Sequence, residues 1–139
     1  MNYLLDTCVI SELVAKRPNP KVIEWIDQTD ETGLYLSVLT IGEIRKGIEK
    51  LPDSERKTAL DLWLRKQLLV RFKGRLLPID IDVMLQWGQL TGKLELEGKA
   101  MSAIDSLIAA TALHGGLTLV TRNDDDFRHT GLPILNLWE

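Results

Sequence analysis

The fold is set by residues 115–121, which read Gly115-Gly116-Leu117-Thr118-Leu119-Val120-Thr121. The two glycines end a helical pattern that runs from Ser102 to His114, and the apolar and β-branched residues after them are typical of a strand. Weaker strand patterns lie elsewhere in the chain, at Tyr3–Leu5, Leu34–Ser37, Leu76–Ile79 and Ile134–Leu137. Pro78 restricts the third of these to an edge or an end of a sheet.

Helical patterns separate these strands. They cover Pro20–Gln28, Thr40–Lys50, Ser54–Phe72, Asp82–Leu96 and Ser102–His114. The alternation predicts an α/β fold of three layers, with a central, mostly parallel sheet flanked by helices. Sheets of this kind bind ligands beyond the carboxyl ends of their strands, so the residues that follow each strand are the first candidates for a site.

The composition predicts one domain, residues 1–139. Of the 139 residues, 45% are hydrophobic and 27% are charged, as in ordinary globular proteins. The net charge of −3 excludes a uniformly basic surface for gripping nucleic acid. Cys8 is the only cysteine and there are two histidines, so neither an internal disulfide nor a four-ligand zinc site without carboxylates is expected. We expect a cytoplasmic protein without a signal peptide or membrane span.

Acidic residues follow the predicted strands and begin the predicted helices. Asp6 comes directly after the first strand, and the run Asn123-Asp124-Asp125-Asp126 follows the strand that ends at Thr121. We expect Glu43 and Asp105 in the first turns of their helices, where the helix dipole favours a negative charge. If the strands are parallel neighbours, these four segments meet at one sheet edge.

Each of these acids also fits a purely structural role. Glu43 comes three residues after Thr40, and Asp105 comes three residues after Ser102, as in a capping box at a helix start. Asp6 fits an Asx turn, and residues 124–126 fit a solvated loop. The argument for a site therefore rests on their joint arrangement.

Convergent carboxylates predict a bound divalent cation. Acids that lie close together raise one another's pKa unless a cation neutralises them. A set of oxygen ligands favours Mg²⁺ or Mn²⁺, which retains water ligands and can bind phosphate oxygens. The sequence thus favours hydrolysis of phosphodiester bonds by a metal-activated water.

The chain resembles PIN-domain ribonuclease toxins of the VapC type, including the FitB-like branch. The resemblance lies in four ordered blocks, at residues 4–12, 36–48, 103–112 and 119–127. It implies a metal-dependent endoribonuclease of a type II toxin–antitoxin system. It further implies an antitoxin of the VapB or FitA kind, a homodimer, and a heterotetramer or larger assembly with the antitoxin on DNA.

The resemblance also implies roles for single residues. Asp6, Glu43 and Asp105 would hold Mg²⁺ or Mn²⁺. The family pattern places a fourth acid either at the position of Asn123 or just before the final Phe, and Asp126, at the second of these positions, would be the fourth catalytic acid. Asn123 and Asp124 would be polar neighbours of Asp126 that contact substrate. The family commonly has asparagine at the position of Cys8, so a polar contact beside the first aspartate is expected to be altered or absent.

An acidic pocket needs nearby cations to bind RNA. Arg122 is the closest candidate in the sequence, and Thr7 and Ser37 have hydroxyls that could bind metal-bound water, although both also suit a cap or turn. The other candidate cations, each of which also fits a solvated helix face, are Arg45, Lys46, Arg65, Lys66, Arg71, Lys73 and Arg75. The tryptophans, which fit base stacking or the core and interfaces, are Trp25, Trp63, Trp87 and Trp138.

Two other enzyme classes and one non-enzymatic function are alternatives to a nuclease. A phosphotransferase of the haloacid dehalogenase kind needs a second aspartate two residues after the first, where this chain has Cys8. A response-regulator receiver needs a central phosphoacceptor aspartate with its lysine, and no convincing pair is present. The non-enzymatic alternative is a PIN-like module that binds RNA or DNA, or is regulated by a partner, without turnover.

Overall fold

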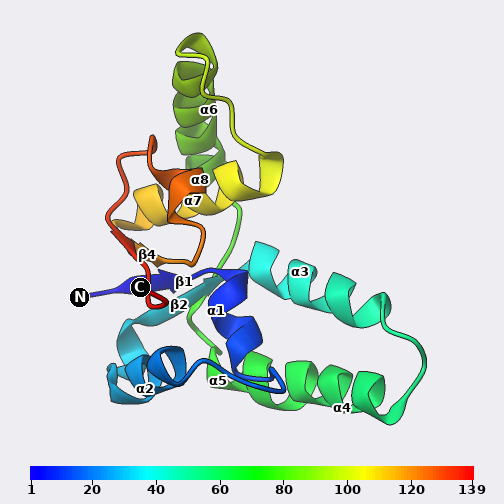
Figure 1. The fold of residues 1–139 in the computed structure, drawn as a ribbon. Coiled ribbons are helices and arrows are strands. Elements are labelled where there is room, and N and C mark those ends of the chain that lie inside the picture. Colours follow the sequence, from blue (N-terminus) through cyan, green and yellow to red (C-terminus); the bar gives the residue numbers. More distant parts are fainter.

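The computed structural model describes residues 1–139 and contains a five-stranded sheet (Figure 1). The strand order is β3-β2-β1-β4-β5, and every neighbouring pair is parallel. The strands are β1 (Tyr3–Leu5), β2 (Leu34–Ser37), β3 (Leu76–Leu77), β4 (Thr118–Val120) and β5 (Ile134–Leu135). The predicted α/β class and parallel sheet are confirmed, and the strand with Pro78 behind it is indeed an edge.

The five predicted helical regions are all present. The α-helices are α1 (Thr7–Glu12), α2 (Pro20–Gln28), α3 (Val38–Glu49), α4 (Glu55–Trp63), α5 (Leu69–Arg71), α6 (Ile81–Leu96), α7 (Ala103–Gly115) and α8 (Asp124–Phe127). A 3-10 turn, η1 (Glu31–Gly33), precedes β2. The single helix predicted over Ser54–Phe72 consists of α4 and α5 joined by a π-helical turn, η2 (Leu64–Leu68). The short helices α1 and α8 were not predicted.

Side-chain alternation along β1 divides the core into two layers. Leu5 packs in a cluster with side chains from α1, α2, α3 and η2, whereas Leu4 packs with side chains from α6, α7 and α8. Figure 1 shows the corresponding arrangement, with α6, α7 and α8 on one side of the sheet and α1, α2 and α5 on the other. This is the predicted three-layer architecture, with β1 at its centre.

The start of α3 differs from the prediction. The helix begins at Val38, and Ser37 caps it by accepting a hydrogen bond from the Leu39 N–H at 3.1 Å. Thr40 is therefore inside the helix and buried, so the predicted capping role of Thr40 is wrong. Glu43 consequently lies beyond the first turn, where the expected support from the helix dipole is lost.

The start of α7 agrees with the prediction. Ser102 is the N-cap and its hydroxyl accepts the Asp105 N–H at 3.3 Å, which places Asp105 in the first turn. Gly116, in the left-handed conformation at φ 63°, ends the helix and leads into β4.

Helices α3 and α4 form a hairpin that extends away from the sheet, and α6 extends away on the other side (Figure 1). The inner end of α3, where it leaves β2, adjoins the sheet edge that carries Asp6. No helix has both the length and the apolar character needed to cross a membrane.

Candidate active site at the carboxyl ends of the strands

Asp6 is held rigidly at the end of the central strand. It caps α1, and its Oδ1 accepts a hydrogen bond from the Thr7 N–H at 2.8 Å. Its Oδ2 accepts a hydrogen bond from the hydroxyl of Thr121, the residue after β4, also at 2.8 Å. Asp6 is only 6% exposed and Thr121 is fully buried. The parallel pairing of β1 with β4 thus fixes this carboxylate from two directions.

Glu43 is tied to the same place through Thr7. The Thr7 hydroxyl donates to Glu43 Oε1 at 2.6 Å and lies 3.2 Å from the hydroxyl of Thr40. These contacts join the first turn of α1 to α3, although the residues are more than 30 positions apart in the sequence. A turn or cap role alone does not account for Thr7, because its hydroxyl also positions the carboxylate of Glu43.

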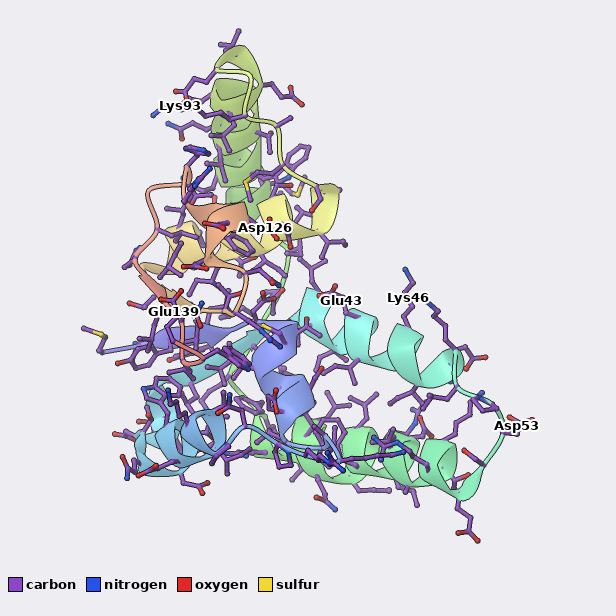
Figure 2. All side chains as sticks on the ribbon, viewed as in Figure 1. Glu43, Lys46, Asp53, Lys93, Asp126 and Glu139 are labelled. Atoms are coloured by element: carbon purple, nitrogen blue, oxygen red, sulfur yellow. The ribbon has the colours of Figure 1, made fainter.

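Asp105 and Asp126 come from the opposite layer. The first is half-buried in α7 and the second is exposed on α8. Figure 2 shows Glu43 and Asp126 facing the corner between α3 and the pair α7 and α8. Burial raises the pKa of Asp105, a hydrogen bond with Ser102 opposes this, and the negative charges of Asp126 and Glu43 raise that pKa further.

The pKa of Asp6 is raised in the same way. Burial is the main cause, and hydrogen bonds from Thr121 and Thr7 counteract it. The charges of Asp105 and Glu43 add to the increase. The predicted acids therefore act on one another electrostatically across the site, as expected for carboxylates that need a cation.

The donor chemistry of this site fits a hard divalent cation. All four candidate side chains offer carboxylate oxygens, and repulsion between them raises the pKa of Asp6 and Asp105. No three His, Cys, Asp or Glu side chains close around a single point. Mg²⁺ does not require such a cage, because it is commonly held by one or two carboxylates and several waters.

Thr121 was missed in the sequence as a site residue. Besides donating to Asp6, its hydroxyl accepts the Asn123 N–H at 3.1 Å and lies 3.8 Å from the Cys8 thiol. Its place directly after the strand that pairs with β1 was the signal that could have identified it.

Cys8 lies beside this network and packs partly against the core. Its sulfur is 3.9 Å from Asp6 Oδ2 and accepts the Arg122 N–H at 3.4 Å. Burial is the largest cause that raises the pKa of the thiol. The contact between Cys8 and Asp6 is thus long, and the same Asp6 oxygen accepts a much shorter hydrogen bond from the Thr121 hydroxyl, at 2.8 Å.

The predicted substrate residues around α8 point in several directions. Arg122 is exposed and its guanidinium lies over the Trp138 ring, 5.7 Å from the centroid. Asn123 is exposed at the start of α8 without a side-chain capping bond, and Asp124 accepts a hydrogen bond from Asn136 at 3.4 Å. The side chains of Arg122 and Asp124 thus contact the C-terminal segment.

The tryptophans have structural partners. Trp25, Trp63 and Trp138 pack against the core, and the indole N–H of Trp87 donates to the Ser106 hydroxyl at 2.9 Å. These contacts agree with the core alternative for Trp25, Trp63 and Trp138.

Comparison with known proteins identifies the family. The PIN-domain family model matches residues 3–132. The chain is 38% identical to the VapC ribonuclease Y4jK of Sinorhizobium fredii, over 98% of this chain and 97% of that protein. It is 36% identical to the toxin FitB of Neisseria gonorrhoeae, over 97% of both chains.

A solved structure supports the same assignment. A chain in the structure of FitAB bound to an IR36 DNA fragment superposes with a TM-score of 0.93 at 34% identity, covering 99% of this chain and 96% of that one. The sheet order, the acidic site and these similarities agree, and the chain belongs to the PIN-domain family.

Proposed function

We propose that this protein is a metal-dependent endoribonuclease and the toxin of a type II toxin–antitoxin pair. The observation that carries the proposal is the convergence of carboxylates from β1, α3, α7 and α8 at one sheet edge of a PIN-domain chain. Its relatives include a protein named as a VapC ribonuclease and one named as a toxin.

In this proposal Asp6, Glu43 and Asp105 hold the ion, either Mg²⁺ or Mn²⁺. When bound, the ion would activate a water and neutralise charge on the phosphate. The chain itself positions the buried ligand: the Thr7 N–H and the Thr121 hydroxyl each donate a hydrogen bond to one oxygen of Asp6. The burial of Asp6 keeps bulk water from competing for this carboxylate.

Glu43 and Asp126 would orient the attacking water from opposite layers. Thr7 engages only Oε1 of Glu43, so Oε2 is free to accept a hydrogen bond from water. Asp126 is exposed and is free to accept a second one. Attack by this water, rather than by the ribose 2'-hydroxyl, would break the bond between phosphorus and the 3' oxygen, which leaves and takes up a proton, so the products carry a 5'-phosphate and a 3'-hydroxyl.

The test is cleavage of a mixed pool of structured RNAs by antitoxin-free protein in Mg²⁺ or Mn²⁺. EDTA, Asp6→Asn and Asp105→Asn should each abolish cleavage, and the products of the unmodified protein should carry 5'-phosphates. Cleavage that persists without metal, or 2',3'-cyclic ends, would contradict the mechanism. Metal binding without any cleavage would favour the non-catalytic PIN-like module instead.

The proposed partners are RNA, an antitoxin of the VapB or FitA kind and a second copy of this chain. The similarity to a chain of FitAB on DNA supports a larger assembly in which the antitoxin contacts DNA. Such a system would act in the cytoplasm, where its RNA substrate is found. Light scattering of the protein alone and with its co-expressed antitoxin would give the two stoichiometries.

A further inference from the structure

A groove leads away from the acids along the outer face of α3. It encloses about 510 Å³. Its lining includes Glu43, Lys46 and Lys50 of α3 and its C-cap, together with Ile104 of α7. In a helix, residues three, four and seven positions apart share one face, so both lysines lie on the Glu43 side of α3. Figure 2 shows Lys46 pointing from α3 toward the side on which α7 and α8 lie.

The floor of this groove is open. Gly42 and Gly47 line it, and a Cβ atom built at either glycine would meet no other atom within 4 Å. A ligand can therefore approach the backbone of α3 between the lysines and Glu43. The exposed side chains of Val38 and Ile104 add apolar surface at the end nearest the acids.

Lys46 and Lys50 differ from most of the basic residues that the sequence suggested as RNA contacts. Neither has a carboxylate partner within 4 Å, and both are exposed. The arginines of the original set are engaged with acids: Arg45 and Arg65 with Asp61, and Arg71 and Arg75 with Glu31. The two lysines beside Glu43 are thus free to bind an anion.

A second hollow lies on the other side of the acids. It encloses about 450 Å³ and is lined by Asp105 and Asp126 as well as by the basic residues Lys99, Arg128 and His129. Only Arg128 has an acidic partner, at 3.7 Å from Asp125, and both of these side chains are exposed. Basic side chains therefore flank the acidic centre on both sides.

We infer that a single strand of RNA crosses the site from the α3 groove to this second hollow, with its phosphates bound by Lys46 and Lys50 on one side and by Lys99 and Arg128 on the other. This inference rests on the proposed function, because the scissile phosphate lies between the two basic groups. An acidic centre repels a polyanion, so exposed cations at both exits are what a nuclease of net negative charge requires. The two lysines of α3 are spaced by about 6 Å along the helix axis, which suits phosphates of one strand.

The experiment compares a long and a minimal substrate. The double variants Lys46→Ala/Lys50→Ala and Lys99→Ala/Arg128→Ala are assayed on single-stranded RNA and on bis(p-nitrophenyl) phosphate, which has no flanking phosphates. We expect kcat/KM for RNA to fall roughly tenfold in each variant, and the slope of log binding constant against log salt to decrease by about 1.4, or 0.7 for each lost contact. Hydrolysis of the minimal substrate should stay within about twofold of the unmodified protein.

The matched control is Lys16→Ala/Lys21→Ala, which removes the same charge from exposed lysines that line neither hollow. Equal losses in the control would show a general charge effect and overturn the inference, as would unchanged RNA cleavage in both test variants. Weaker antitoxin binding with unchanged RNA cleavage would make the α3 groove a protein-docking surface instead. If the unmodified protein cleaves neither substrate, it is the proposed function that fails.

Discussion

Asp6 and Asp126 belong to the same acidic site but are held in opposite ways. Asp6 is buried at the end of the central strand, and both of its oxygens accept hydrogen bonds. Asp126 is exposed on the four-residue helix α8, which has no side-chain cap. The comparison teaches that one half of the site is organised by the sheet before any ligand binds, whereas the other half is open to solvent and substrate.

The largest effect is expected at the buried half. Asp6→Asn keeps the shape of the side chain but removes its charge, and we expect RNA cleavage to fall roughly a thousandfold, as for the loss of several kcal/mol of transition-state stabilisation. Removal of the buried charge stabilises the metal-free variant, but the amide nitrogen of asparagine cannot accept the hydrogen bond that one oxygen of Asp6 accepts, so we expect the urea midpoint to change little. Cleavage assays measure the loss of activity, and urea titrations in EDTA measure the stability. If the variant were unfolded, its lost activity would not support the distinction between the buried and the exposed half of the site.

Thr121→Val tests whether the hydrogen bonds organise that half. The substitution leaves Asp6 Oδ2 and the Asn123 N–H without their partner, so we expect unfolding to become easier by about 1–3 kcal/mol. Loss of the bond also raises the pKa of Asp6 further, which moves the acid limb of the pH–rate profile to higher pH. Thr111→Val is the control, since that buried hydroxyl donates only to the Leu107 carbonyl, and its pH profile should not move.

In the exposed half of the site, substitution of Asp126 should change activity but not stability. We expect Asp126→Asn to lower kcat/KM for RNA roughly tenfold, within the range of a positioned acid or base, without a change in the urea midpoint, because the side chain is exposed. Asp27→Asn, at an exposed helical position that lines neither hollow, is the matched control and should cleave normally. A loss of stability at Asp126, or equal losses at both positions, would remove the distinction between the two halves.

The smallest expected effect is the pH dependence of the stability of the metal-free protein. Burial raises the pKa of Asp6 and Asp105, so the folded state holds these protons more tightly than the unfolded state. The part of the stability that these two carboxyls contribute is therefore fully present below their ordinary pKa of about 4 and is lost as the pH rises through the raised pKa values. The ion-paired Glu31, whose pKa is lowered, acts in the opposite direction.

Urea titrations across this range measure the decrease, and Mg²⁺ or Mn²⁺ should reverse it by favouring the charged forms. Asp105 is half-buried, so its share is smaller than that of Asp6, and Asp6→Asn should remove most of this destabilisation at rising pH. A slope that is the same with and without metal would argue against a cation at this site.

Much of the fold could be predicted because long patterns dominate it. The helix before β4, the strand itself and the alternation of strands with helices all have strong local signals. The helices α1 and α8 have six and four residues, too few for a periodic pattern to be visible. The start of α3 was misplaced because Ser37 both ends β2 and caps the helix, so the strand pattern concealed the cap.

The candidate site could likewise be predicted only in part. Asp6, Glu43 and Asp105 were predicted to converge from topology alone, since parallel strands bring their carboxyl ends to one edge. The role of Thr7 and Thr121 depends on side-chain hydrogen bonds between segments far apart in the chain, which no local pattern encodes. The unpaired state of Lys46 and Lys50 likewise became visible only when the partners of the other basic residues were known.

The hydrogen bond between Asp6 and Thr121 joins residues 115 positions apart. During translation the central strand β1 is made long before its partner β4. The sheet therefore cannot close on this side of β1 until β4 has been synthesised, and such long-range pairing is intrinsically slow. A nascent chain that lacks β4 has no assembled acidic site, so the ribosome that makes it is not exposed to the nuclease before β4 emerges.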